Sequence, residues 1–334
     1  MKNVLVTGGA GYIGSHCVKR LVNDGYNVTV LDNCDRGHAV AVDKAGSGEA
    51  KLARVDLRET DRVAAVLTEN QIEGVIHFAA LAYVGESVTQ PLRYYDNNTA
   101  GSVSLLSAMD RAGVSRIVFS STCATYGEPE RMPITEDLPQ QPINPYGWSK
   151  LYTERALIDY GHANKGFGFA ALRYFNVAGS DPQGVIGEDH EPETHIIPVV
   201  LNCALGKVEK ISIFGDDYDT PDGTCIRDYI HVQDLVDAHL VVLNALEDSD
   251  QRFYNLGTGT GTTVMQIVEA GREVTGHAIP AEVGPRRPGD PPMLYADPGK
   301  IRRELGWEAK CKDIRQMVAD AWQWFEANPG GYGE

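Results

Sequence analysis

Residues 4–32 read VLVTGGAGYIGSHCVKRLVNDGYNVTVLD, and this stretch decides how the rest of the chain is interpreted. Residues 4–6 form a short apolar run, which is typical of a strand buried on both faces of a parallel sheet. Glycines follow at 8, 11 and 14, and apolar residues then recur at helical spacing as far as residue 22. A second apolar run, 28–31, follows Gly25 and ends at Asp32. The stretch predicts a strand, a glycine turn, a helix and a second strand.

The glycine turn predicts a dinucleotide-binding site. Glycines let the backbone turn tightly and approach a pyrophosphate, whose charge lies at the N-terminus of the following helix. The carboxylate of Asp32 suits the 2′-hydroxyl of a ribose and repels a 2′-phosphate, so this residue favours NAD over NADP. A glycine turn alone is weak evidence, but the flanking strands, the helix and Asp32 make the pattern specific.

Composition excludes several classes of partner. The chain has 334 residues, which suits one large domain with a smaller one, and its net charge of −16 argues against nucleic acid or an anionic membrane. The six cysteines contain no CxxC pair and no metal-ligand spacing with histidine, so we expect reduced thiols, a cytoplasmic protein and no metal site. No apolar run approaches the ~20 residues of a membrane span.

Apolar runs alternate with helical segments through the first half of the chain. Further strands are predicted at 51–55, 74–80, 116–121 and 167–174, and helices at 60–70, 91–112 and 146–162. The alternation predicts an α/β fold with a Rossmann-type doubly wound parallel sheet, in which ligands bind at the carboxyl ends of the strands.

Beyond residue 176 this alternation lapses. We predict an NAD-binding Rossmann domain over 1–178, joined by a returning helix at 232–246, and a smaller C-terminal α/β substrate domain over 179–334. Short strands at 211–214 and 253–255 are expected in the smaller domain. The last helix, 313–327, has an apolar stripe that is typical of core packing.

Tyr146 and Lys150 are the strongest candidates for catalysis. A spacing of four places them on one helical face, one turn apart. A nearby ammonium favours the phenolate, so Lys150 is expected to lower the pKa of Tyr146 from its ordinary ~10. Tyr146 could then act as a general acid and base near neutral pH. Thr122 could bind a substrate oxygen, or it could simply cap its strand, and a Tyr-Lys pair at this spacing often marks only a solvated helix face.

Several longer motifs resemble those of the UDP-glucose 4-epimerases, within the extended short-chain dehydrogenase/reductase family. They are TGGAGYIGSH (7–16), HFAA (77–80), VGESV (84–88), YYDNN (94–98), PYG with SK (145–150), RYFN (173–176), RDYIHV (227–232) and PRR with GD (285–290). The resemblance covers nearly the whole chain. It implies a tightly held NAD that is regenerated in each turnover, a UDP-sugar substrate, and a homodimer joined by helices near 90–112 and 146–162.

The resemblance also implies a mechanism that interconverts UDP-glucose and UDP-galactose. Tyr146 takes the proton of the sugar 4′-hydroxyl while hydride passes from C4′ to the nicotinamide, and both return after the 4-keto sugar has turned over. Lys150 holds the nicotinamide ribose, and Thr122 steadies the reacting oxygen. Arg227 and Arg287 are the expected pyrophosphate clamps, because guanidinium groups bind phosphate well. Each arginine could instead form a surface or interdomain salt bridge.

The resemblance implies one set of residues that bind the cofactor and one set that bind the substrate. Of the three catalytic residues, Tyr146 belongs to both sets, Lys150 to the cofactor set and Thr122 to the substrate set. The cofactor set is Gly8, Gly11, Tyr12, Ile13, Gly14, Asp32, Asn33, Asp56, Leu57, Phe78, Ala79, Ala80, Asn97, Ser120, Tyr146, Lys150 and Tyr174. The substrate set is Ser121, Thr122, Tyr146, Phe175, Asn176, His195, Ile196, Ser212, Phe214, Arg227, Tyr229, Arg287, Asp290 and Leu294.

Three positions depart from the common family pattern. Thr122 stands where serine is frequent, and the hydroxyl is kept. Ala82 stands where a lysine often contacts the cofactor ribose, a contact that Tyr83 could replace only in part. Leu294 is intermediate between the bulky aromatic residue that limits the sugar pocket and the small residue that admits N-acetyl sugars.

Other functions remain open at this point. A nucleotide-sugar 4,6-dehydratase needs an Asp-Glu pair after the hydroxyl residue, where this chain has Cys123 and Ala124. Leu294 leaves open a 4-epimerase of UDP-N-acetylglucosamine or UDP-xylose. A non-catalytic NAD(H)-binding regulator would be favoured by loss of Tyr146 or Lys150, and both are present.

Overall fold

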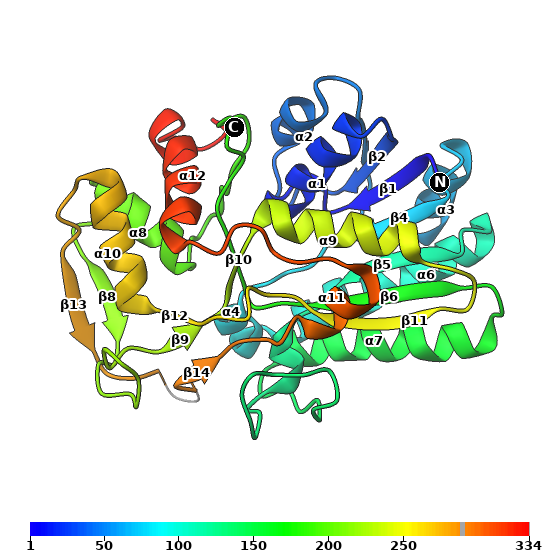
Figure 1. Ribbon diagram of the computed structural model, residues 1–334. Helices are drawn as coiled ribbons and strands as arrows, with labels where there is room; N and C mark the ends of the chain where they lie inside the picture. The colour runs from blue at the N-terminus through cyan, green and yellow to red at the C-terminus, as the bar shows by residue number, and fades with distance from the viewer. Residues whose placement is uncertain (288–290, 334) are drawn as a thin grey trace.

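The central element of the computed structural model, which describes residues 1–287 and 291–333, is a sheet of seven parallel strands (Figure 1). The strand order is β11-β6-β5-β4-β1-β2-β3. The bounds are β1 Asn3–Thr7, β2 Asn27–Asp32, β3 Lys51–Arg54, β4 Gly74–His77, β5 Arg116–Ser120, β6 Gly168–Arg173 and β11 Gln251–Asn255. The order reverses between β1 and β4, where a doubly wound sheet binds its ligands. The predicted Rossmann-type sheet is confirmed.

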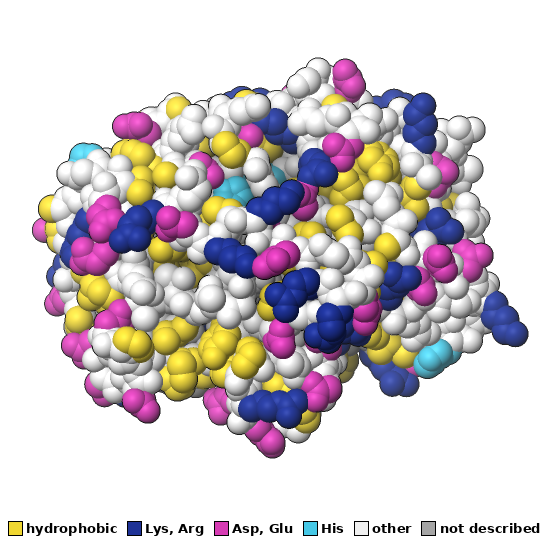
Figure 2. Space-filling view, in the orientation of Figure 1, with side chains coloured by type: hydrophobic (Ala, Val, Ile, Leu, Met, Phe, Trp, Pro, Cys, Tyr) yellow, Lys and Arg dark blue, Asp and Glu magenta, His cyan; other side chains and the backbone are white. Residues whose placement is uncertain are grey.

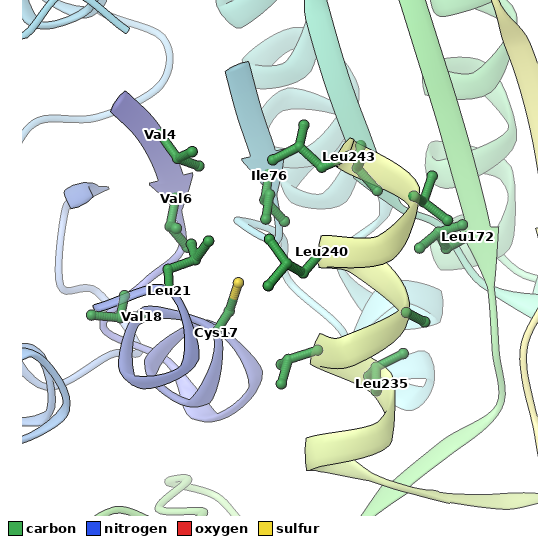
Figure 3. Packing of buried hydrophobic residues seen from close by; sticks show 14 of the residues in the cluster. Val4, Val6, Cys17, Val18, Leu21, Ile76, Leu172, Leu235, Leu240 and Leu243 are labelled. Carbon is green, nitrogen blue, oxygen red and sulfur yellow. The ribbon is translucent and has the colours of Figure 1, made fainter. Parts of the chain in front are cut away.

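Helices cover both faces of this sheet, because its inner strands, such as β4 and β6, are buried on both sides. On one face lie α1 (Tyr12–Asn23), α2 (Ala39–Gly46) and α9 (Val232–Ala245). On the other face lie α3 (Thr60–Glu69), α6 (Gly101–Ala112) and α7 (Pro145–Ala163). Figure 3 shows Leu240 of α9 pointing toward Ile76 of β4, beside Cys17 of α1. Each fully buried side chain of this size contributes about 1.5–3 kcal/mol.

The strand β11 is a correction to the sequence analysis. Residues 253–255 were expected in the smaller domain, but β11 pairs in parallel with β6 and forms an edge of the central sheet. Tyr254 is fully buried there. The paired residues are about 80 positions apart in the sequence. The local pattern of apolar residues predicts a strand, but it does not show which sheet the strand joins.

The smaller part of the molecule has its own core, formed by α8 (Ile196–Ala204), α10 (Val264–Thr275) and α12 (Ile314–Ala327) with β8, while β13 pairs with β8 at the surface (Figure 1). Its strands are β8 Ile211–Phe214 with β13 Ala281–Gly284, and β9 Ile226–Arg227 with β12 Thr262–Thr263 and β14 Met293–Leu294. Between the two parts lie β7 Asn176–Ala178 and β10 Tyr229–His231. The helix α11 (Gly299–Leu305) packs against β11 and α9.

The segment predicted as one helix over 91–112 is divided into three. The helix α5 (Pro91–Tyr94) leads into the π-helix η1 (Tyr95–Ala100) and then α6, while α4 (Val84–Thr89) precedes them. Asn98 in η1 is buried, accepts a hydrogen bond from the Leu81 N–H at 2.8 Å, and donates one to Ser149 Oγ at 3.0 Å. The π turn therefore aims an amide that joins the loop after β4 to α7, in keeping with the frequent use of such turns beside functional sites.

The surface carries charges of both signs. Figure 2 shows acidic and basic side chains intermingled over the visible face. Within residues 1–287 and 291–333, no helix has both the length and the apolar character needed to cross a membrane.

Candidate active site

A cavity of about 1600 Å³ opens at the carboxyl ends of the central strands and extends to the smaller part of the molecule. Gly8 and Asp32 line one region of it, Tyr146 another, and Ser212 and Phe214 of β8 a third. Pockets for single drug-sized ligands measure about 300–1,000 Å³. The volume therefore suits two nucleotide-sized ligands side by side. Every residue of the predicted cofactor set lines this cavity.

The glycine turn lies at one end of the cavity, where α1 begins. Gly8 has a φ of +71°, and a Cβ there would lie 2.6 Å from the backbone nitrogen of Ala79. A Cβ on Gly14 would lie 2.0 Å from the carbonyl oxygen of Gly8. The loop can hold this shape only with glycine, and it leaves the N-terminus of α1 open to an anion. These residues fit the pyrophosphate of a dinucleotide.

Asp32 is fixed at the cavity wall by two backbone groups. Its Oδ2 accepts a hydrogen bond from the Ala10 N–H at 3.0 Å, and its Oδ1 accepts one from the Cys34 N–H at 2.8 Å. Burial raises the pKa of Asp32, and these two hydrogen bonds oppose that rise. A carboxylate oriented in this way can also accept from the hydroxyls of a ribose.

Replacing Gly14 with alanine is expected to destabilise the fold by about 1–3 kcal/mol, because the added Cβ meets backbone rather than a mobile side chain. The purified variant should also contain less NAD. Urea denaturation and the NAD released on denaturation measure the two effects. Gly330→Ala is the matched control, since a Cβ at Gly330 has no heavy atom within 4 Å. Equal behaviour of the two variants would contradict this account of the turn.

Tyr146 and Lys150 lie on the first turns of α7, where the N-cap Asn144 accepts a hydrogen bond from the Gly147 N–H at 2.8 Å. The Lys150 Nζ donates to the carbonyl oxygen of Ser120 at 2.7 Å and lies 6.0 Å from the centre of the Tyr146 ring. Thr122, two residues beyond the end of β5, interacts with Tyr146 and acts to lower its pKa. All three catalytic candidates line the cavity.

The expected effect of Lys150 on the pKa of Tyr146 is not observed. Burial raises the pKa of Tyr146 to about 12, and the interaction with Thr122 is what opposes the rise. Burial likewise lowers the pKa of Lys150 to about 7, although the carboxylate of Glu154 acts against it. The prediction was wrong for this state of the protein, because it counted the charge and omitted the loss of water around both groups.

Ser121 is a second correction, since it does not line the cavity. Its hydroxyl is buried and donates to Glu154 Oε1 at 2.5 Å. Glu154 lies one turn beyond Lys150 on the same face of α7 and forms a buried ion pair with Arg173 at 2.7 Å. Glu154 was not predicted as a residue that supports the site. Its position could have indicated this, because residues 146, 150 and 154 follow one another at a spacing of four on one face of α7.

Among the other predicted substrate residues, Phe214, Arg227 and Arg287 lie in or beside the short strands of the smaller part, at the far end of the cavity. The Arg287 guanidinium lies 3.9 Å from the centre of the Phe214 ring, and the Arg227 Nη1 donates to the carbonyl oxygen of Ile226 at 2.6 Å. Asp290 lies outside the described residues. The remaining members that line the cavity are Phe175, Asn176, His195, Ile196, Ser212, Tyr229 and Leu294.

Several cavity residues were not predicted. Arg36 lies at the cofactor end, and its guanidinium is 5.2 Å from the centre of the ring of Tyr83, the residue expected to replace the lysine contact in part. Glu188, His190 and Glu193 line the cavity beside His195. The run EDHEPETH at 188–195, dense in histidine and glutamate, was the signal available for the last group.

The fold and the cavity define an enzyme of the dinucleotide-dependent, short-chain dehydrogenase/reductase type. Residues 4–257 match the NAD dependent epimerase/dehydratase family, and the chain belongs to it. The predictions of an enzyme and of NAD as its cofactor are confirmed.

Known proteins resemble the chain over its full length. A UDP-glucose 4-epimerase of Streptococcus mutans is 51% identical over 334 residues, which is 99% of each chain. A protein of Oryza sativa named probable UDP-arabinose 4-epimerase 3 is 46% identical, over 99% of this chain and 84% of its own. The crystal structure of UDP-glucose 4-epimerase from Bifidobacterium longum, in complex with NAD+ and UDP, is 41% identical with a TM-score of 0.95, and the match covers 99% of this chain and 100% of that one.

Proposed function

We propose that the protein interconverts UDP-glucose and UDP-galactose by oxidising the sugar at C4 and returning the hydride to the opposite face. The observation that carries the proposal is that Tyr146, Lys150 and Thr122 share one cavity with the glycine turn and Asp32. Relatives named UDP-glucose 4-epimerase, at about half identity over nearly the whole chain, support the same activity.

The cofactor is proposed to lie along the carboxyl ends of β1, β2 and β4. The glycine turn and the N-terminus of α1 hold its pyrophosphate, and Asp32 accepts hydrogen bonds from its adenosine ribose. Asp56 lies close by, where its Oδ2 accepts from Asn33 Nδ2 at 2.9 Å. NAD bound there would supply a reversible acceptor for the hydride of the sugar.

The UDP group is proposed to bind at the end of the cavity that lies against β8. Arg227 and Arg287 hold the diphosphate, because guanidinium groups pair well with phosphate and the chain is otherwise acidic. Phe214 offers an aromatic face that is 38% exposed and can stack with a uracil ring. A firm grip on UDP leaves the sugar free to turn over.

Tyr146 is proposed to be the acid and base of the reaction. It removes the proton of the 4′-hydroxyl and returns it later, and Thr122 holds the reacting oxygen and the phenol together through its hydroxyl. Lys150 supplies a donor to the nicotinamide ribose once it leaves the carbonyl oxygen of Ser120. Lys150 is buried and Tyr146 is half-buried, and hydrogen bonds in such a setting are stronger than in water.

A 4-epimerase of another UDP-sugar is the second candidate. Leu294 lies on β14 and lines the cavity, and its side chain is smaller than an aromatic ring. One relative at 46% identity is named a probable UDP-arabinose 4-epimerase. The test below therefore includes a UDP-pentose and a UDP-N-acetyl sugar as alternative substrates.

The test offers UDP-galactose, UDP-N-acetylgalactosamine and UDP-xylose separately to the purified protein, without added NAD, and identifies the sugar products. We expect UDP-galactose to give UDP-glucose at the highest rate. Conversion of only one of the other two would assign the second candidate, and no conversion of any would overturn the proposed function. The Tyr146→Phe variant, prepared in parallel, controls for a contaminating epimerase.

We also infer that the protein forms a homodimer through α4, α5, α6 and α7. Large apolar side chains are exposed there, with Leu92 80% exposed and Val88 61% exposed. Others are Val84, Val103 and Tyr152. A surface with several exposed apolar side chains suits association between two copies of the chain. Light scattering should give twice the chain mass for the wild type and the single mass for Leu92→Asp, and a monomeric wild type would contradict the inference.

The cytoplasm is the proposed location. All six cysteines are in the described residues, and none forms a disulfide. Burial raises the pKa of the Cys17 and Cys123 thiols, which keeps them protonated and unreactive. Reduced thiols of this kind are typical of cytosolic proteins. Cell fractionation with an antibody against the chain would test the location.

A further inference from the structure

Four side chains from residues 188–195 converge at the cavity wall, and none has a step in the proposed reaction, although His195 belongs to the predicted substrate set. Glu188, His190, Glu193 and His195, called the quartet below, each bring one nitrogen or oxygen to within 4.8 Å of the others. The carboxylate of Glu188 is buried, and that of Glu193 is nearly so. The imidazoles are less enclosed, with the side chains of His190 and His195 20% and 39% exposed, and each pairs with both carboxylates.

The distances within the quartet match those between the ligands of a metal ion. The Nδ1 atoms of His190 and His195 lie 3.2 and 3.1 Å from Glu188 Oε1. They lie 3.6 and 3.0 Å from the oxygens of Glu193. Zinc bonds to nitrogen and oxygen measure about 2.0–2.2 Å, so the ligands of a tetrahedral zinc ion lie roughly 3.3 Å apart.

His190 supplies an independent observation. Its Nδ1 atom is buried and makes no well-aligned hydrogen bond in the described structure, although it lies 3.2 Å from a Glu188 oxygen and 3.6 Å from a Glu193 oxygen as an ion pair. A buried polar atom of this kind normally has a partner. An ion at the centre of the quartet would satisfy this nitrogen together with the other three ligand atoms.

We propose that the quartet is a binding site for a divalent first-row transition-metal ion of the zinc class. Two imidazoles and two carboxylates suit Zn²⁺, Co²⁺ or Mn²⁺, whereas Mg²⁺ and Ca²⁺ prefer oxygen ligands alone. No metal site was predicted from the sequence, because that prediction rested on the spacing of the cysteines. The quartet contains no cysteine. Binding displaces protons from the imidazoles to solvent.

The quartet lies in a segment that crosses the cofactor end of the cavity. The Tyr12 hydroxyl donates to the Gly179 carbonyl oxygen at 2.6 Å, and Arg36 Nη1 donates to the Glu191 carbonyl oxygen at 2.9 Å. His195 is the N-cap of α8, so an ion in the quartet would fasten this segment to α8. The ion is therefore assigned a structural role.

The test titrates Zn²⁺ into chelator-treated protein by calorimetry, in a buffer that contains excess Mg²⁺. We expect one Zn²⁺ per chain, with proton uptake by the buffer. His190→Asn and Glu193→Gln should each weaken binding on the order of 100-fold, because each removes a direct ligand. His162→Asn, an exposed histidine at the end of α7, is the matched control and should bind as the wild type does.

A second probe separates the quartet from the thiols. Co²⁺ should give the visible absorption of a tetrahedral site with nitrogen and oxygen ligands, without a thiolate charge-transfer band. Failure of the wild type to bind Zn²⁺ saturably, a thiolate band with Co²⁺, or unchanged affinity in folded His190→Asn and Glu193→Gln would each overturn the proposal. Binding is measured directly, so the result does not depend on which sugar the enzyme converts.

Discussion

Tyr146→Phe is expected to lower the turnover of UDP-galactose by about 10²–10⁴-fold, the usual contribution of a general acid-base group. The change removes one hydroxyl and its interaction with Thr122, and it keeps the ring. The edge-to-face contact with Tyr94, at 6.5 Å between ring centres, is retained. The variant should therefore fold normally and keep its NAD, because no residue of the glycine turn is altered. Initial rates and the NAD content of the purified protein measure the two expectations.

Tyr160→Phe is the matched control for this result. It removes one phenol from the same helix, where the hydroxyl donates to Asp110 Oδ1 at 2.7 Å, at the end away from the cavity. We expect its rate to remain at the level of the wild type. A Tyr146→Phe variant with wild-type turnover would remove Tyr146 from the mechanism, and one without NAD would show that its hydroxyl serves cofactor retention instead.

The central sheet could be predicted because its strands carry their own signal. Residues 4–6, 28–31 and 116–120 are short apolar runs, and burial on both faces of a parallel sheet requires that pattern. The glycine turn could be predicted for a similar reason, since only glycine fits between its backbone neighbours. Strand β11 could not, because its membership depends on pairing with a distant strand.

The cavity residues likewise divide into those that local sequence predicts and those that depend on the whole fold. The spacing of Tyr146 and Lys150 fixes them on one helical face, which is a local property. The pKa of Tyr146 depends instead on the burial supplied by the whole fold, and it was predicted with the wrong sign. Ser121 and Ser120 are neighbours, yet only Ser120 lines the cavity, because successive residues point to opposite sides of an extended chain. The quartet was missed because an irregular segment brings its members together, without a helical or strand period.

The buried pair behind Lys150 leads to the second large prediction. Glu154 and Arg173 are both almost completely buried and join at 2.7 Å. Arg173 also donates to the Tyr126 hydroxyl at 2.7 Å, and Ser121 donates to Glu154 at 2.5 Å, so the network links α7 to the ends of β5 and β6. Replacing Glu154 with glutamine leaves the charge of Arg173 buried without a partner.

Glu154→Gln is expected to lower the free energy of unfolding by about 3–5 kcal/mol, the usual cost of removing one member of a buried ion pair. Arg155→Gln is the control on the next residue of the same helix. It breaks an exposed pair with Asp159, in which the side chains are 69% and 55% exposed. Such a pair contributes only about 0.3–0.5 kcal/mol. Urea denaturation gives both values, provided that the slope against denaturant is unchanged. Similar losses in the two variants would mean that the Glu154–Arg173 pair is solvated in solution, and α7 would then need another anchor to hold Lys150 against β5.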